Sequence, residues 1–122
     1  MKVSQLMTRH PKFIPADESV LHAAETLAKN DIGALPVEKG DRLIGMLTDR
    51  DIVVRVVAAG HDPVKTRVEE VISPQVKYCF DDEDVEHVKQ NMQELRVRRL
   101  PVVNRDKRLV GMISLEDISK RH

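Results

Sequence analysis

The pattern of apolar and polar positions divides each half of the chain into the same short elements. Apolar residues recur at helical spacing in two segments, at Val20, Ala23, Ala24, Leu27 and Ala28 and again at Val85, Val88, Met92 and Leu95. Each segment follows a run of acidic residues, and helices favour Asp at their N-caps and acidic residues in their first turns. The pattern therefore predicts two helices, capped by Asp17 and Asp82.

Two short apolar runs separated by a charged turn follow each predicted helix. They are ALPVEKGDRLIGMLT at 34–48 and RLPVVNRDKRLVGMIS at 99–114. Such runs predict β-hairpins, with turns at Lys39–Arg42 and Asn104–Arg108. A closing helix is then predicted over Asp49–Ala59, ended by Gly60–Pro63, and a second from Leu115 to about Arg121.

The second half of the chain repeats the first at an offset of 65 residues. KFIPADESV aligns with KYCFDDEDV, and LIGMLTDRDI aligns with LVGMISLEDI after one inserted residue near Arg108. Halves of this size hold little core alone, so we expect them to pack on one another. The expected fold is α/β, with two tandem β-α-β-β-α motifs in pseudo-twofold symmetry. The motifs are residues 1–60 and 68–122, joined by a linker at 61–67.

The order of these phrases resembles the cystathionine beta-synthase (CBS) domain, and two in tandem resemble the pair called a Bateman module. The resemblance runs from Val3 to Ile118 and is carried by IGALPVEKGDRLIGMLTDRDI and VRRLPVVNRDKRLVGMISLEDI. It implies a regulatory sensor that binds AMP, ADP or ATP in clefts between the motifs, with S-adenosylmethionine or NAD as alternative ligands. It also implies a homodimer joined by closing helices, which signals through its own assembly or an unknown effector protein.

The repeated strand-to-helix phrase carries chemistry that suits a ribose. Thr48 and Asp51 lie three residues apart, as do Ser114 and Asp117, so hydroxyl and carboxylate share one face. A carboxylate only accepts hydrogen bonds and has two oxygens, which suits the two ribose hydroxyls. The alternative interpretation is that both pairs cap helices, because Thr, Ser and Asp favour helix starts. Capping and ligand contact can coexist.

The resemblance also implies the other contacts of a nucleotide. Adenine would lie against the first strand of the opposite motif, at His10, Pro11 and Lys12 for one site and at Gln75, Val76 and Lys77 for the other. Ordinary strand-entry residues would explain these positions equally well.

Phosphate binding is implied at Arg98 and Arg99, because arginine forks match phosphate oxygens, with Arg50 as a further contact. A solvated charged strand edge is the alternative interpretation of the pair. The first motif has Gly33–Ala34 in place of Arg98–Arg99, so the two sites are expected to bind phosphate unequally.

Composition and missing motifs narrow the function further. Lys plus Arg and Asp plus Glu both number 20, and aromatic residues make up 2% of the chain, which argues against a nucleic-acid binder. No membrane span or signal segment is evident, and the single Cys79 cannot form an internal disulfide, so the cytoplasm is expected.

Catalytic and metal-binding motifs are missing as well. His22 and His87 stand at equivalent repeat positions but have no partner at ligand spacing, so neither is expected to bind metal. Cys79 is expected to be a buried, inert thiol. No nucleotide-hydrolase loop is present, and neither catalysis nor a cofactor is expected. A pure interaction module with empty clefts remains the other alternative.

Overall fold

The computed structural model describes residues 1–72 and 75–120. The chain divides into two compact units, each with its own sheet and its own apolar core. The first, here called the β3–β4 unit, is Lys12–Val76, and the second, the β6–β7 unit, combines Met1–Pro11 with Lys77–His122. Among the described residues, no helix has the length and apolar character that crossing a membrane requires.

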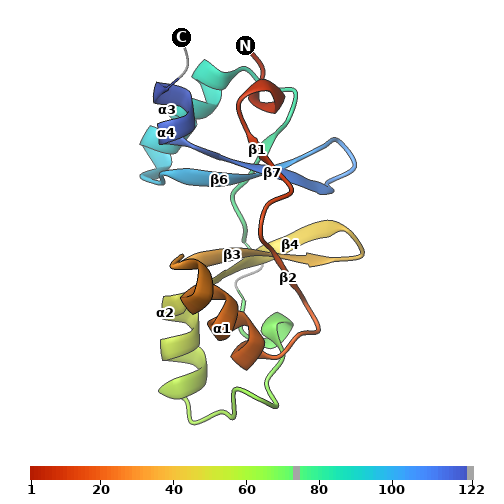
Figure 1. Ribbon diagram of the computed structural model, residues 1–122, viewed down its shortest axis with the longest axis vertical. Helices are drawn as coiled ribbons and strands as arrows, with labels where there is room; N and C mark the ends of the chain where they lie inside the picture. The colour runs from red at the N-terminus through yellow and green to blue at the C-terminus, as the bar shows by residue number, and fades with distance from the viewer. Residues whose placement is uncertain (73–74, 121–122) are drawn as a thin grey trace. The chain divides into compact units, whose positions relative to one another are not determined.

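The β3–β4 unit holds a three-stranded sheet in which β2 runs parallel to β3 and β3 antiparallel to β4. Its two principal helices cover one face of this sheet (Figure 1). The elements are β2 (Ile14–Pro15), α1 (Val20–Asn30), β3 (Ala34–Lys39), β4 (Arg42–Thr48), α2 (Asp49–Ile52), the π-helical turn η2 (Val53–Val57) and the 3₁₀ turn η3 (Val68–Glu70). Helix α1 buries Val20, Ala23 and Leu27. Of the other two positions predicted from helical spacing, Ala24 is half-buried and Ala28 is exposed.

The β6–β7 unit repeats this arrangement and adds a strand. Its sheet has the order β1-β7-β6-β5, and α3 and α4 lie over one face of it (Figure 1). Helix α3 buries Val85, Val88 and Met92. The elements are the 3₁₀ turn η1 (Val3–Gln5), β1 (Thr8–Arg9), β5 (Cys79–Phe80), α3 (Val85–Leu95), β6 (Arg99–Val103), β7 (Leu109–Ser114) and α4 (Leu115–Ser119).

The mixed α/β architecture and both hairpins are confirmed, whereas the predicted helix caps are wrong. Ser19 caps α1 and its hydroxyl accepts the His22 N–H at 3.1 Å. Asp84 occupies the N-cap position of α3. Both true caps lie two residues beyond the predicted Asp17 and Asp82, because backbone hydrogen bonds to neighbouring segments hold the intervening residues outside the helix.

The two closing helices are shorter than the sequence predicts. The first is regular over Asp49–Ile52 and then widens into η2, where the Ala58 N–H reaches the Val53 carbonyl five residues back, at 2.8 Å. The second ends at Ser119 within the described residues, and Arg121 lies outside them.

The segment that leads into each repeat packs against the start of the other repeat's helix. The Val3 N–H donates to the Glu83 carbonyl at 2.9 Å, and the Val68 N–H donates to the Glu18 carbonyl at 2.9 Å. The two bonds are equivalent, because their donors, and likewise their acceptors, are 65 residues apart in the sequence. The compact units therefore differ from the predicted motif boundaries, since residues 1–11 pack with the second repeat and residues 61–76 with the first.

Candidate functional site

The strand-to-helix phrase forms the same reciprocal capping arrangement in both repeats. The Thr48 hydroxyl accepts the Asp51 N–H at 3.1 Å, and the Asp51 carboxylate accepts the Thr48 N–H at 2.9 Å. Ser114 and Asp117 do the same at 3.1 and 3.0 Å. Each pair thereby satisfies two backbone donors that a helix start leaves without an intrahelical partner. The capping interpretation of these four residues is therefore correct.

Capping leaves part of each pair available for a ligand. Only one carboxylate oxygen of Asp51 and of Asp117 is engaged in its capping box. The hydroxyls of Thr48 and Ser114 accept one hydrogen bond there and keep their own protons to donate. All four residues are half-buried, so the remaining groups reach the surface. Contact with a ribose stays a prediction that this geometry permits.

A pocket of about 180 Å³ opens beside the second pair, entirely within the β6–β7 unit. It combines one guanidinium, two carboxylates and two hydroxyls, since its lining residues are Thr8, Arg99, Met112, Ile113, Ser114, Glu116 and Asp117. Arg99 is the register partner of Ser114 across β6 and β7. The hairpin therefore places a cation beside the Ser114–Asp117 pair.

The two arginines of the Arg98–Arg99 pair have different surroundings. Arg99 lines the pocket, whereas the Arg98 guanidinium lies 4.0 Å from the Glu116 carboxylate, with both side chains mostly exposed. Glu116 occupies the repeat position of Arg50, so the charge on the first turn of the helix is reversed between repeats. Glu116 was not predicted as a site residue. Its alignment with Arg50, a predicted phosphate contact, is the signal in the sequence that could have identified it.

Gly33 and Ala34 occupy the positions of Arg98 and Arg99 in the first repeat, with the same backbone hydrogen bonding but no cationic side chain. The Gly33 carbonyl accepts the Asp49 N–H at 3.0 Å, as the Arg98 carbonyl accepts the Leu115 N–H at 2.9 Å. Ala34 is the register partner of Thr48. The exposed Arg50 is the cation nearest in sequence to Thr48. Unequal phosphate binding at the two sites stays a prediction, and it would come from the side chains, since the backbone hydrogen bonds match.

The residues predicted to contact adenine are divided between the two units. His10 and Pro11 belong to the β6–β7 unit, with Ser114 and Asp117, because β1 pairs antiparallel with β7 just before them. Gln75 and Val76 belong to the β3–β4 unit, with Thr48 and Asp51. Lys12, in contrast, belongs to the β3–β4 unit, and Lys77 belongs to the β6–β7 unit. Thr8, from β1, lines the pocket and was not predicted as a site residue, because its partner β7 is distant in sequence.

Cys79 and the repeated histidines His22 and His87 lie in different surroundings. Cys79 is buried, and burial, followed by the charges of Glu83 and Asp81, raises the pKa of its thiol to about 12. His22 and His87 are exposed. Within residues 1–72 and 75–120, no group of three or more His, Cys, Asp or Glu side chains is placed to hold a metal ion.

Comparisons with known proteins, by sequence and by structure, find the same family. The profile of the CBS domain matches residues 3–58 and 68–121. Hypoxic response protein 1 of Mycobacterium tuberculosis is 39% identical over 104 residues, which cover 84% of this chain and 72% of that protein. The CBS domain-containing protein YhcV of Bacillus subtilis is 34% identical over 117 residues, covering 96% and 82%.

Solved structures agree over nearly the whole chain. The crystal structure of Hypoxic Response Protein I with two coordinated zinc ions has a TM-score of 0.86 and 34% identity, covering 100% of this chain and 99% of that one. The CBS domain pair of MJ0100, in complex with 5′-methylthioadenosine and S-adenosyl-L-methionine, has a TM-score of 0.77 and 29% identity, covering 98% and 94%. This chain belongs to the CBS domain family and contains two CBS domains in tandem.

Proposed function

We propose that this protein is a non-catalytic regulatory module that reversibly binds AMP, ADP or ATP, most tightly in the Arg99–Ser114–Asp117 pocket. The observation that carries the proposal is the joint lining of one pocket by Arg99, Ser114 and Asp117. The free oxygen of Asp117 and the Ser114 hydroxyl suit a ribose, and Arg99 suits a phosphate. The adenosyl ligands of the MJ0100 pair support this ligand class.

The decisive experiment compares adenosine with AMP, ADP and ATP by isothermal titration calorimetry, with S-adenosylmethionine and NAD as further ligands. Arg99→Ala should weaken AMP about tenfold more than adenosine, because a charge-assisted hydrogen bond contributes about 1.5–3 kcal/mol before solvent screening. Arg98→Ala is the matched control and should change little, since Arg98 lies outside the pocket lining and faces Glu116.

The acid should behave differently from the arginine. Asp117→Asn should weaken adenosine and AMP by the same factor, because the ribose is common to both. A ligand at a hundred times its dissociation constant should raise the unfolding free energy by about 2.7 kcal/mol. Absence of heat and of any melting shift with every adenosyl compound would leave the alternative of a ligand-free interaction module. Salt-sensitive binding to generic DNA in its place would favour a nucleic-acid partner.

Zinc is not part of this proposal. Two zinc ions are coordinated in Hypoxic Response Protein I. In the described part of the present chain, however, His, Cys, Asp and Glu side chains form no group of three or more with metal-binding placement.

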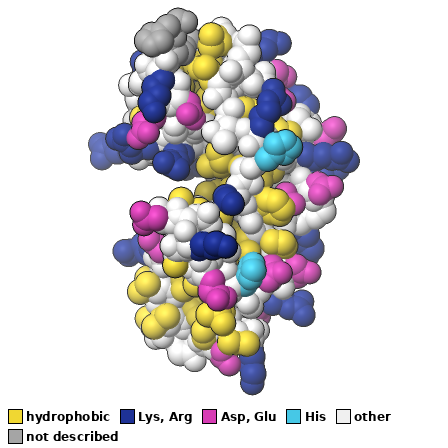
Figure 2. Space-filling view, viewed as in Figure 1, with side chains coloured by type: hydrophobic (Ala, Val, Ile, Leu, Met, Phe, Trp, Pro, Cys, Tyr) yellow, Lys and Arg dark blue, Asp and Glu magenta, His cyan; other side chains and the backbone are white. Residues whose placement is uncertain are grey.

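A second proposal is that the module forms a homodimer through the α2–η2 helix. Val53, Val54 and Val57 on this helix are 58%, 49% and 67% exposed. Figure 2 shows hydrophobic side chains over this helix, at the lower left of the molecule. Val53 and Val57 are four residues apart and share one face, and apolar faces of this kind commonly meet a partner.

Sedimentation at micromolar concentration tests the dimer, with and without nucleotide. The double change Val53→Asp and Val57→Asp should convert a dimer into a monomer, because it would bury two charges at the contact. Val64→Asp is the matched control, since Val64 is 61% exposed but lies outside the helix. A monomer mass for the unmodified chain under both conditions would exclude the dimer.

A further inference from the structure

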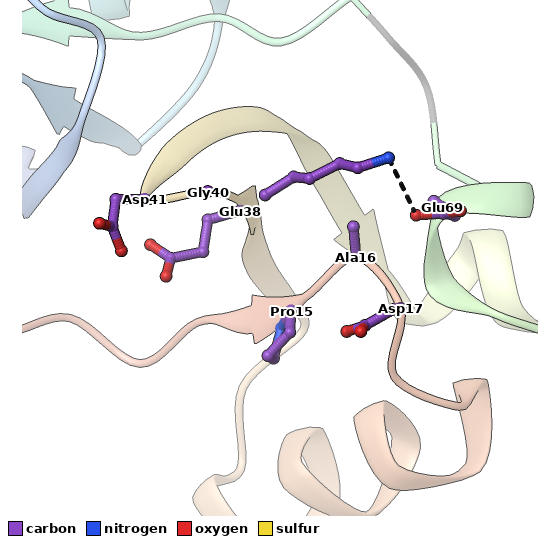
Figure 3. Close-up of a pocket in the computed structure, with 8 residues that line it drawn as sticks. Pro15, Ala16, Asp17, Glu38, Gly40, Asp41 and Glu69 are labelled. Atoms are coloured by element: carbon purple, nitrogen blue, oxygen red, sulfur yellow. Dashed lines mark ion pairs between the residues drawn. The ribbon is translucent and has the colours of Figure 1, made fainter.

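A second pocket, of about 240 Å³, lies at one edge of the sheet in the β3–β4 unit, away from the capping pairs. It is bounded by the chain just after β2, by the β3–β4 turn and by η3 (Figure 3). Its lining is strongly acidic and consists of Pro15, Ala16, Asp17, Glu38, Lys39, Gly40, Asp41 and Glu69.

Most of the negative charge in this pocket has no counter-ion. Lys39 lies 3.8 Å from Glu69, the ion pair drawn as a dashed line in Figure 3. Among the described residues, the side chains of Asp17, Glu38 and Asp41 have no hydrogen-bond or ion-pair partner. Burial, and then the charge of Asp41, raises the pKa of the Glu38 carboxyl. A cation in the pocket would relieve this repulsion.

The second repeat contains the same backbone frame, so the two positions can be compared directly. Ala16 donates its N–H to the Glu38 carbonyl at 2.9 Å, and the repeat-equivalent Asp81 donates to the Val103 carbonyl at 2.9 Å. Strand pairing agrees as well, because Pro15 pairs with Glu38 where Phe80 pairs with Val103. Asp17 therefore corresponds in space, as in sequence, to Asp82.

In the second repeat this position holds a guanidinium. Arg105 donates from Nε and Nη2 to the two carboxylate oxygens of Asp82, at 2.9 and 2.7 Å. The same guanidinium stacks on the Phe80 ring, 4.0 Å from its centroid. Two parallel hydrogen bonds to a carboxylate and stacking on a flat face are the interactions that select a guanidinium over an ammonium.

The first repeat has the carboxylate but lacks the arginine. The residue aligned with Arg105 is Gly40, and the β3–β4 turn is one residue shorter than its counterpart. Gly40 and Asp41 form this turn with φ of 59° and 66°. Gly40 and Asp41 therefore bring no long side chain over Asp17, and the neighbouring Lys39 pairs with Glu69 instead. The guanidinium position that Arg105 fills in the second repeat is left open here.

We propose that the pocket around Asp17 binds an alkylguanidinium cation supplied from outside the chain, in the way that Asp82 binds Arg105. The Asp17 carboxylate accepts the two parallel N–H donors of the guanidinium. Glu38 and Asp41 add negative charge near the cation. Pro15 supplies an apolar surface at the position that Phe80 has in the second repeat. This inference does not depend on nucleotide binding, because the pocket shares no residue with the Arg99–Ser114–Asp117 site.

The test is a titration of the isotope-labelled full chain with methylguanidinium chloride, followed by amide chemical shifts at constant ionic strength. Shifts should saturate and centre on residues 16–17, 38–41 and 69. Asp17→Asn should weaken this binding about tenfold, because a charge-assisted bidentate contact is lost. Asp82→Asn is the matched control and should leave it unchanged, since Asp82 is already occupied by Arg105.

A gain of function checks the comparison between the repeats. Arg105→Ala vacates the guanidinium position and should create a second methylguanidinium site, with shifts around Phe80 and Asp82. Titration with L-arginine and with N-acetyl-L-arginine amide then distinguishes a free small molecule from an arginine side chain carried on a peptide. Equal shifts with tetramethylammonium, or methylguanidinium shifts that Asp17→Asn leaves intact, would overturn the proposal, because they would reveal only diffuse charge attraction.

Discussion

Gly111→Ala tests the packing of the N-terminal segment on the sheet that carries the nucleotide pocket. Gly111 is buried in β7 and is the register partner of Arg9 in β1. A methyl group at this position would lie 2.7 Å from the Met7 sulfur and 2.7 Å from the Thr8 carbonyl oxygen. The methionine can rotate away, but the backbone carbonyl cannot, so β1 has to move.

The expected cost follows from this overlap. Overpacking a tight interior typically costs about 1–3 kcal/mol. For a chain of this length each kcal/mol lowers the melting temperature by about 4 °C, so we expect a decrease of about 4–12 °C. Thr8 lines the nucleotide pocket and would be displaced together with β1. Nucleotide affinity at that site should therefore decrease as well.

Thermal denaturation followed by circular dichroism measures the effect, and Gly33→Ala is the control. A methyl group at Gly33 would lie 3.4 Å from the Asp49 carboxylate, an ordinary contact, and Gly33 has no positive φ. That substitution should be neutral or should stabilise the fold by about 0.4–1 kcal/mol, because alanine lowers the conformational entropy of the unfolded chain. A Gly111→Ala protein that melts with the unmodified chain would refute the packing of β1 against β7.

Three further predictions concern single side chains. Ser114→Ala should lower the unfolding free energy by about 1 kcal/mol in urea denaturation, because the cap of α4 is lost, whereas Ser114→Thr should preserve it; equal losses would contradict the capping role. Cys79, with a pKa of about 12, should not react with a thiol reagent at neutral pH until urea unfolds the chain, and fast labelling of the native protein would show that the thiol is accessible. The raised pKa of Glu38 means that the folded state holds this proton more tightly than the unfolded state, so its contribution to stability is lost as pH rises from about 4.5. Glu38→Gln should therefore gain stability relative to the unmodified chain above that pH in denaturation curves, and a constant difference at every pH would refute the assignment.

The sequence by itself determined the elements and the capping pairs. Helical spacing identified the buried face of α1 at Val20, Ala23 and Leu27, and both hairpins have their turns where the charged residues stand. The Thr48–Asp51 pair is equally local, since its two hydrogen bonds join residues three positions apart. Interactions of this range depend on neighbours that the sequence places side by side.

Only the tertiary structure decided which repeat each leading segment joins. Val3 bonds to Glu83, eighty positions away, and this choice places Thr8 in the pocket with Ser114. The two repeats have nearly the same pattern of apolar and polar residues. That pattern therefore cannot tell whether a leading segment packs on its own repeat or on the other one. The same limit applies to the caps, because long-range backbone bonds, and not acidic composition, determine that α1 begins after Ser19 and leave Asp17 in its open pocket.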